Sequence, residues 1–442
     1  MSVNSKELSE ADFKELRADA ASQPRADVLA RVITANGINQ AAKDPEATVR
    51  LDPVFSVDLQ TGSVSNQKQS GRCWLFSLLN TLRHGFAKEY KVKDFELSEK
   101  YLFFWDKIER ANIFYDRMIA TAGRPVNDRE VTYYLDAPGD DGGQWGMAAA
   151  LVQKYGVVPA SLYPETNNVE NTGALNTILN RKLRKDGMIL RSLVQDGHTD
   201  EEIISARGKM LKEIYRIVVY SLGVPPTAVE FAYRDDDKKY HKVSGLTPKE
   251  FFDQYFKVDL DNYVVLTNSP EKPFDKLYSL PSSQNVVGGK QVEFLNVPMD
   301  YLKRAAIAQL KAGETVWFGN DVLEQMDRKS GFLDSNLYRY SELFDVDLEM
   351  SKAERLEYHQ AEVSHAMTLT GVDLDEEGNP TKWKVENSWG EKNGVKGYFT
   401  MADNWMEDYV YEVVVRKEFL TSSQEKLLNT APVELPAWDS LA

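Results

Sequence analysis

The spacing of apolar side chains changes along the chain and divides it into a helical part and a strand-rich part. After Cys73, apolar residues recur every four positions, as on one face of a helix: Trp74, Leu78, Leu82 and Phe86. Helical patterns and charged residues continue from Asn168 to Leu260, whereas short alternating runs typical of strands follow Phe294. This order of elements predicts an α+β fold.

The strand-rich part contains five runs that we expect to form strands: Thr315–Phe318, Val363–Val372, Trp383–Asn387, Gly397–Thr400 and Tyr409–Arg416. Val54–Leu59 alternates in the same way and predicts one more strand. The two ends of the chain differ from the rest. Ser5–Ala21 predicts a polar helix that lies as an arm on a larger body, and Leu428–Ala442 predicts an extended tail.

The composition excludes several classes of protein. With 53 basic and 68 acidic residues the net charge is −15, which argues against nucleic-acid binding and against a polybasic membrane anchor. No apolar run reaches the roughly 18 residues of a membrane span, and the charged segment Met1–Ala21 lacks the apolar core of a signal peptide. Cys73 is the only cysteine, so no intrachain disulfide can form. These features predict a cytoplasmic protein without membrane contact.

Cys73 is the first candidate for chemistry. A lone cysteine is more often a small buried apolar residue than a nucleophile. However, Gln69, Ser70 and Gly71 predict a turn that leads into the helix, which places Cys73 in its first turn. The positive end of the helix dipole favours the thiolate, which is the nucleophilic form of cysteine. We therefore interpret Cys73 as a candidate nucleophile.

A cysteine nucleophile needs a base, and the chain offers five histidines: His84, His198, His241, His359 and His365. His84 lies on the polar side of the first helix and is expected at the surface, whereas His198 and His241 fall in polar loops. His365 lies on the apolar face of an alternating strand and therefore requires a buried partner. It is the candidate base, with a structural histidine as the alternative.

Asn387 is the expected partner of His365, because it occupies the apolar face of the strand Trp383–Asn387. An amide oxygen that accepts a hydrogen bond from an imidazole fixes its tautomer and orientation. The indole of Trp389 would shield this bond from water. Gln67, six positions before the cysteine, could donate its amide N–H to an oxyanion together with the backbone N–H of Cys73.

No metal or other cofactor is expected. Asp373, Asp375 and Glu377 match the opening of an EF-hand loop, but Lys384 stands where that loop requires a bidentate glutamate. A hairpin turn between the histidine strand and the asparagine strand explains these residues better.

Three segments together resemble the papain-like cysteine peptidases: Gln67–Trp74, Ser364–Ala366 and Asn387–Gly390. Glutamine, cysteine, histidine and asparagine occur in the order of that family, and Gly142 and Gly143 resemble its segment that binds the substrate backbone. Here the histidine follows the cysteine by far more than the roughly 130–150 positions of secreted members, which implies an insertion. The resemblance extends along nearly the whole chain to the bleomycin hydrolase and bacterial aminopeptidase C branch.

The resemblance implies a papain-like fold with a helical left domain that carries the catalytic helix and an antiparallel β-barrel right domain. It adds a large helical insertion and N- and C-terminal arms. The implied division is 1–53 for the N-terminal arm and helix, 54–165 for the left domain, 166–293 for the insertion, 294–425 for the right domain and 426–442 for the C-terminal arm.

The resemblance also implies a cytosolic cysteine aminopeptidase that acts on peptides and assembles as a homohexamer. Its C-terminal arm would lie in the cleft, where the carboxylate of Ala442 pairs with the α-ammonium of the peptide. The tail after Trp438 is shorter than is usual for aminopeptidase C, so an oligopeptide endopeptidase is an alternative. A catalytically inert binding scaffold on the same fold is a further alternative.

Overall fold

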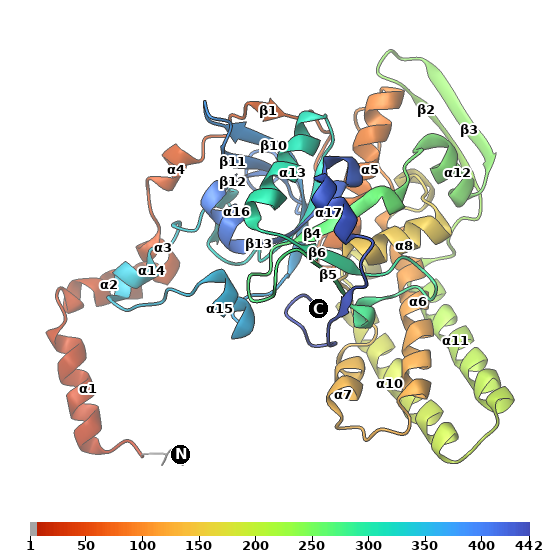
Figure 1. Cartoon of the computed structure of the whole chain (residues 1–442), viewed down its shortest axis with the longest axis horizontal. Coiled ribbons are helices and arrows are strands. Elements are labelled where there is room, and N and C mark those ends of the chain that lie inside the picture. The colour runs from red at the N-terminus through yellow and green to blue at the C-terminus, as the bar shows by residue number, and fades with distance from the viewer. Residues whose placement is uncertain (1–6) are drawn as a thin grey trace.

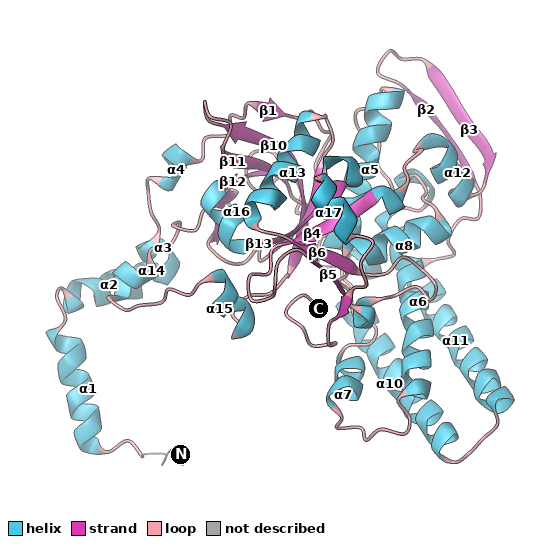
Figure 2. Ribbon diagram, viewed as in Figure 1, coloured by secondary structure: helices cyan, strands magenta, loops and turns pink. Residues whose placement is uncertain are grey.

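The computed structural model describes residues 7–442 and shows a helical part beside a sheet. In Figure 1 the long helices gather on the right and the sheet lies left of centre. Figure 2 shows the same division, with most strands in the sheet and a separate two-stranded hairpin at the upper right. The expected α+β class is confirmed.

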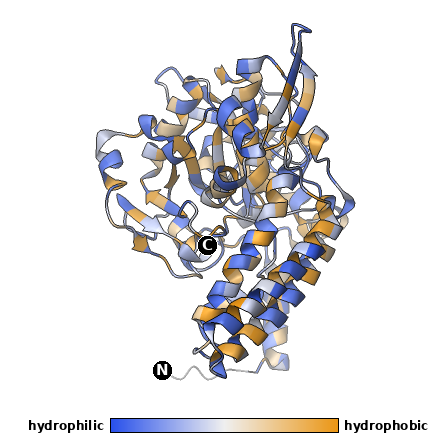
Figure 3. Ribbon diagram, turned by 90° about the vertical axis from the view of Figure 1, so that its right-hand side faces the viewer, coloured by the Kyte–Doolittle hydropathy of each residue, from blue (hydrophilic) through white to orange (hydrophobic). Residues whose placement is uncertain are grey.

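The helical part is built on α5 (Cys73–Tyr90), whose apolar row is buried as expected from the spacing: Trp74, Leu78, Leu82 and Phe86. Its other helices are α6 (Glu99–Ala120), α7 (Arg129–Asp136), α8 (Trp145–Tyr155), α9 (Asn167–Glu170), α10 (Gly173–Gln195), α11 (Asp200–Leu222) and α12 (Pro248–Tyr255). Figure 3 shows apolar and polar residues on different faces of the long helices, which pack through their apolar faces.

The helical expectation for Asn168–Leu260 is correct for α10 and α11 and wrong for two strands that lie between α11 and α12. There the chain forms an antiparallel hairpin of β2 (Val229–Arg234) and β3 (Tyr240–Leu246). The turn of this hairpin is the charged loop between Arg234 and Tyr240. In a short run where apolar and polar residues are mixed, periodicity alone does not distinguish a hairpin from a helix.

Within the described residues the main sheet has twelve strands: eleven in the order β14-β5-β6-β4-β13-β7-β10-β11-β12-β9-β8, and β1, which pairs with β10. Five central strands pair antiparallel: β13 (Val410–Arg416), β7 (Val316–Asn320), β10 (His365–Leu374), β11 (Pro380–Glu386) and β12 (Tyr398–Ala402). The outer strands are β1 (Val57–Asp58), β4 (Tyr263–Thr267), β5 (Lys276–Ser279), β6 (Glu293–Asn296), β8 (Met326–Asp327), β9 (Phe332–Leu333) and β14 (Val433–Glu434). Of the strand expected over Val54–Leu59, only β1 forms.

A second hydrophobic core lies between this sheet and α13 (Met299–Lys311). The remaining helices beside the sheet are α14 (Tyr340–Phe344), α15 (Lys352–Glu357), α16 (Asp403–Tyr409) and α17 (Ser422–Leu427). Strands β4 and β5 belong to the sheet although they precede position 294, and the boundary expected there falls inside β6. The division into five segments stays a prediction.

The first two helices of the N-terminal segment lie apart from both hydrophobic cores. The N-terminal segment forms α1 (Glu10–Ser22), α2 (Ala26–Asn36), α3 (Ile38–Ala42) and α4 (Ala47–Arg50). Neither α1 nor α2 has a buried residue, and Figure 1 shows both reaching away from the body. Ser9 caps α1, so this helix begins later than expected, and Ser5 lies outside the described residues. No helix within residues 7–442 is long and apolar enough to cross a bilayer.

Candidate active site

Cys73 is the first residue of α5, where the backbone N–H groups of the first turn point toward it. The residue before it, Arg72, is fully buried and holds Glu165 through two hydrogen bonds of 3.0 and 2.7 Å. This bidentate pair fixes the chain as it enters the helix. The Cys73 side chain lines a cleft of about 510 Å³ that also contains His365.

His365 is the first residue of β10, and Asn387 directly follows β11, the neighbouring strand. The imidazole Nε2 and the Asn387 Oδ1 lie 2.9 Å apart, and both residues are buried. This bond leaves Nδ1 as the free ring nitrogen of His365. The Trp389 ring packs beside the imidazole at 5.0 Å between ring centres, and the guanidinium of Arg328 covers the outer face of this indole.

Gln67 connects the cysteine segment to the asparagine segment. Its backbone N–H donates to the Ser388 carbonyl at 2.8 Å, and its Oε1 accepts from the Ser388 hydroxyl at 2.5 Å. The amide Nε2 donates to the carbonyl of Ser70 at 2.6 Å. In this conformation one amide hydrogen is used within the loop, which leaves one N–H for another acceptor.

Gly142 and Gly143 line the same cleft as Cys73. Gly142 has a φ of +82°, and its N–H donates to the carbonyl of Gly71 at 2.9 Å. A Cβ on Gly143 would lie 2.8 Å from the Trp74 ring, so only glycine fits this close approach. The glycine segment is therefore held directly against the start of α5.

Asp141 is a positioning residue that sequence reasoning did not single out. Its carboxylate accepts from the Gly71 N–H at 2.9 Å, from Lys107 at 2.8 Å and from the Thr172 hydroxyl at 2.5 Å. Burial opposes its ionisation, but Lys107 and these hydrogen bonds hold the pKa of Asp141 well below its ordinary value. The carboxylate thereby ties the turn before Cys73 to the glycine segment.

The C-terminal arm is docked along the molecule and reaches the cleft. Strand β14 pairs parallel with β5, and Leu441 is fully buried. The Gln144 amide donates to the Leu441 carbonyl at 2.6 Å, and Lys272 lies 3.0 Å from the Asp439 carboxylate. These contacts place Ala442 in the lining of the cleft.

Burial shifts both candidate reacting groups toward their neutral forms. It raises the pKa of the Cys73 thiol to about 11, although the backbone N–H groups around the sulfur favour the thiolate. It lowers the pKa of His365 to about 4, opposed by the hydrogen bond to Asn387 and assisted by the nearby Arg328. The N–H groups at the start of α5 thus favour the thiolate, and desolvation opposes them. A proton transferred from the thiol to the imidazole would create two opposite charges that stabilise each other.

The expectation that His84 lies at the surface is wrong. Its side chain is mostly buried, and Nε2 lies 3.0 Å from Glu386 Oε2. The other oxygen of Glu386 accepts from Arg83 at 2.6 Å. Burial opposes the ionisation of this carboxyl, but His84 and Arg83 hold its pKa below the ordinary value. Because Glu386 directly precedes Asn387, this cluster fixes the asparagine relative to α5.

The structure thus brings Cys73, His365, Gly142, Gly143 and Ala442 to one cleft. Asn387 and Trp389 lie behind the imidazole, and Gln67 lies beside them in the Ser388 contact. Residues 7–442 contain no group of three or more histidine, cysteine, aspartate or glutamate residues placed to hold a metal ion.

The chain is similar to known proteins along nearly its whole length. Residues 7–442 match the model of the Peptidase C1-like family. The chain is 54% identical to Aminopeptidase G of Lactobacillus delbrueckii subsp. lactis, covering 99% of this chain and 100% of the relative. It is 53% identical to Aminopeptidase E of Lactobacillus helveticus, covering 99% of each.

The fold is also similar to that of a solved structure. The crystal structure of PepW from Lactobacillus rhamnosis HN001 superposes with a TM-score of 0.97 at 48% identity and covers 98% of each chain. The expected fold class and family are therefore confirmed, and the chain belongs to the Peptidase C1-like family of papain-like cysteine peptidases.

Proposed function

We propose that the protein is a cysteine aminopeptidase in which Cys73 is the nucleophile and His365 is the base. The observation that carries this proposal is the cleft that contains both groups, with His365 held by Asn387 at 2.9 Å. The aminopeptidase names of relatives with 53–54% identity support the substrate class.

In the proposed mechanism, His365 takes the proton of Cys73, and the thiolate attacks the carbonyl carbon of the peptide. The imidazolium then gives this proton to the leaving amine, and water hydrolyses the acyl-enzyme. Asn387 keeps His365 in the tautomer that presents Nδ1 to the sulfur, while Trp389 excludes water from the bond between them. The second amide hydrogen of Gln67 and the backbone N–H of Cys73 stabilise the oxyanion.

Substrate binding is assigned to Gly142 and Gly143 for the peptide backbone and to Ala442 for the amino terminus. The Ala442 carboxylate attracts an α-ammonium group, and a blocked terminus would leave this carboxylate unpaired in the cleft. The contacts of Leu441 and Asp439 hold the arm in the position that this role requires.

The proposal is tested by comparing each peptide with a free and with an N-acetylated amino terminus. We expect the intact protein to prefer the free terminus, and a variant that lacks Leu441 and Ala442 to lose this preference. Internal cleavage of acetylated peptides at the same rate by the intact protein would instead identify the endopeptidase alternative.

The inert-scaffold alternative is tested by Cys73→Ala. We expect this variant to lose peptidase activity and to keep its fold, as measured by circular dichroism. Peptidase activity that survives in Cys73→Ala would contradict the proposed nucleophile. Absence of activity in both proteins would favour the scaffold.

We further propose a cytoplasmic homohexamer that does not bind nucleic acid. The single cysteine, which cannot form an intrachain disulfide, supports the cytoplasmic compartment. The net charge of −15 argues against nucleic-acid binding. Assembly is supported by exposed apolar side chains on the N-terminal helices: Phe13, Leu16, Val28 and Val32. Sedimentation velocity is the test, and removal of residues 1–36 should reduce the sedimentation coefficient.

A further inference from the structure

In the glycine segment, the backbone groups of Gly142 and Gly143 differ in their partners. The N–H of Gly142 donates to the Gly71 carbonyl at 2.9 Å, and the carbonyl of Gly142 accepts from Arg110. Neither the N–H nor the carbonyl of Gly143 forms a hydrogen bond within residues 7–442. Because Gly143 also lines the cleft, it is the residue of the pair whose backbone can bind a peptide there.

The orientation of the peptide bond between the two glycines is not fixed by side-chain sterics. Gly142 has a φ of +82°, and neither residue has a Cβ, so the plane between them can rotate at little steric cost. In a trans peptide the carbonyl and the N–H point in opposite directions. A rotated plane would reverse the N–H of Gly143, so a defined orientation requires a contact from elsewhere.

Arg110 of α6 supplies this contact. Its Nη2 donates to the Gly142 carbonyl, and its Nε donates to Asp106 Oδ2 at 2.7 Å. No other side chain among the described residues donates to this carbonyl. The guanidinium lies 5.9 Å from the centre of the Trp74 ring, the same ring that leaves no room for a Cβ on Gly143. With its carbonyl held by Arg110, the peptide bond directs the Gly143 N–H away from α6.

Asp106 holds the guanidinium in place. It lies one helical turn before Arg110, and its side chain has no exposed surface. Its second oxygen, Oδ1, accepts from Nδ2 of Asn285 at 2.8 Å. A planar guanidinium that is bound at two of its nitrogens has little freedom to turn. The position of the Gly142 carbonyl is therefore determined by a network that begins inside α6.

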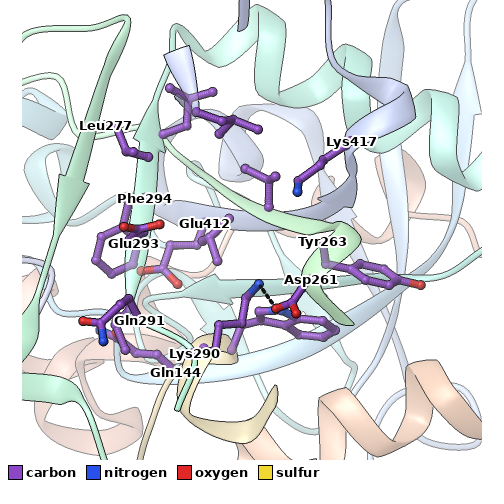
Figure 4. Close-up of a pocket in the computed structure, with 17 residues that line it drawn as sticks. Gln144, Asp261, Tyr263, Leu277, Lys290, Gln291, Glu293, Phe294, Glu412 and Lys417 are labelled. Atoms are coloured by element: carbon purple, nitrogen blue, oxygen red, sulfur yellow. Dashed lines mark hydrogen bonds and ion pairs between the residues drawn. The ribbon is translucent and has the colours of Figure 1, made fainter. Parts of the chain in front are cut away.

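The neighbours of the glycine pair fix its two ends but not the peptide bond between them. On one side, Asp141 accepts from the Gly71 N–H at 2.9 Å. On the other side, Gln144 donates to the Leu441 carbonyl at 2.6 Å. Its side chain also lines a neighbouring cavity of about 360 Å³, which Figure 4 shows. The peptide bond in the middle is left to Arg110.

We propose that Arg110 is a positioning residue for peptide binding: by holding the Gly142 carbonyl, it keeps the free backbone groups of Gly143 directed at the backbone of the substrate. Asp106 acts one step further back and holds Arg110. This inference rests on the proposed peptidase function and adds to it the network that orients the glycine segment. Loss of this network weakens peptide binding and leaves the chemical step at Cys73 little changed.

The test variant combines Arg110→Met with Asp106→Asn, because Arg110→Met alone would leave a buried carboxylate without its counter-ion. Asp106→Asn keeps the shape of the side chain and an acceptor for Asn285. The matched control is Arg207→Met. The Arg207 side chain is 24% exposed, against 18% for Arg110, and it donates to Asn112 of the same helix at 2.7 Å. It holds α6 without a contact to the glycine segment.

Calorimetry measures the binding of peptides to these variants in the Cys73→Ala background. One peptide has amide bonds throughout, and in each of the others one non-scissile amide is replaced by an ester, which removes an N–H donor. With Arg110 present, we expect one ester to weaken binding at least tenfold, equal to about 1.4 kcal/mol. The combined variant should bind the all-amide peptide at least about tenfold more weakly, and the same ester should then cost less than about twofold. Arg207→Met should change neither value.

Kinetics with Cys73 present give a second readout. The backbone pairing is made in the ground state and in the transition state alike, so its loss should raise KM and leave kcat within about threefold. A general loss of structure would instead lower the fraction of active protein, and with it kcat.

Four outcomes would overturn the proposal: no ester effect with Arg110 present, an ester effect of full size in the combined variant, an equal loss of binding in Arg207→Met, or a fall in kcat at unchanged KM. If the intact protein cleaves peptides, any of these results overturns the positioning role alone. The expected binding pattern in a protein that cleaves no peptide would support the positioning role and contradict the proposed peptidase function instead.

Discussion

Replacing Glu386 by glutamine tests whether the buried cluster behind Asn387 holds the two parts of the molecule together. The Glu386 side chain has no exposed surface, and the Arg83 side chain with which it pairs is 5% exposed. Glutamine has the same shape but no charge, so Arg83 would stay buried without its counter-ion. Removing one partner of a buried pair costs about 3–5 kcal/mol, and we expect a loss of unfolding free energy of about 3 kcal/mol.

The assay is urea denaturation at one fixed protein concentration, because assembly would make stability depend on concentration. Glu96→Gln is the matched control, since Glu96 lies 3.9 Å from the same guanidinium but its side chain is 49% exposed. This exposed pair should contribute less than about 1 kcal/mol. Equal and small losses in both variants would refute the reasoning.

The pH dependence of stability gives the same prediction a second readout. The pKa of Glu386 is lowered below its ordinary value of 4.5, so the folded state favours the carboxylate. The stability that this group contributes is therefore present above about pH 4.5 and is lost as the pH falls through the lower folded pKa. Glu386→Gln should lack this acidic loss, and the intact protein should show it.

Three further predictions concern the cleft itself. Gly143→Ala should destabilise the fold by about 1–3 kcal/mol in urea denaturation, because the new Cβ would lie 2.8 Å from the buried Trp74 ring. The control Gly123→Ala places its Cβ in open space and should change the stability little. Equal losses of stability in the two variants would contradict the packing argument. Burial lowers the pKa of His365 to about 4, so the imidazole stays neutral above that pH. We therefore expect kcat/KM to fall only as the pH approaches 4. A fall in kcat/KM centred near pH 6.5 would contradict this prediction. Asn387→Ala should lower kcat by about 10²-fold with an unchanged far-ultraviolet spectrum, because the imidazole loses its orientation; unchanged kcat would remove Asn387 from the site.

The sequence was sufficient for features that depend on local periodicity. The apolar row from Trp74 to Phe86 predicted a helix with the correct buried face. Strands β10 and β11 overlap the runs expected to form them, although Asn387 lies just past the end of β11. The bond between His365 and Asn387 follows from two polar residues on apolar strand faces, because each needs a partner once buried.

Other features required the three-dimensional structure. His84 is polar and lies beside the apolar row, so its side chain was expected in water; its burial depends on Glu386, some three hundred positions later. Asp141 gains its role in the same way, from contacts with distant segments.

Covalent labelling of Cys73 tests the central claim most directly. The chain has one cysteine, so a thiol-directed epoxide can form only one thioether, and intact-mass spectrometry measures its rate of formation. The account predicts a single adduct on Cys73 that forms at least about 10²-fold more slowly in His365→Ala, because the base that removes the thiol proton is gone. No adduct, or equal rates in the two proteins, would contradict the account.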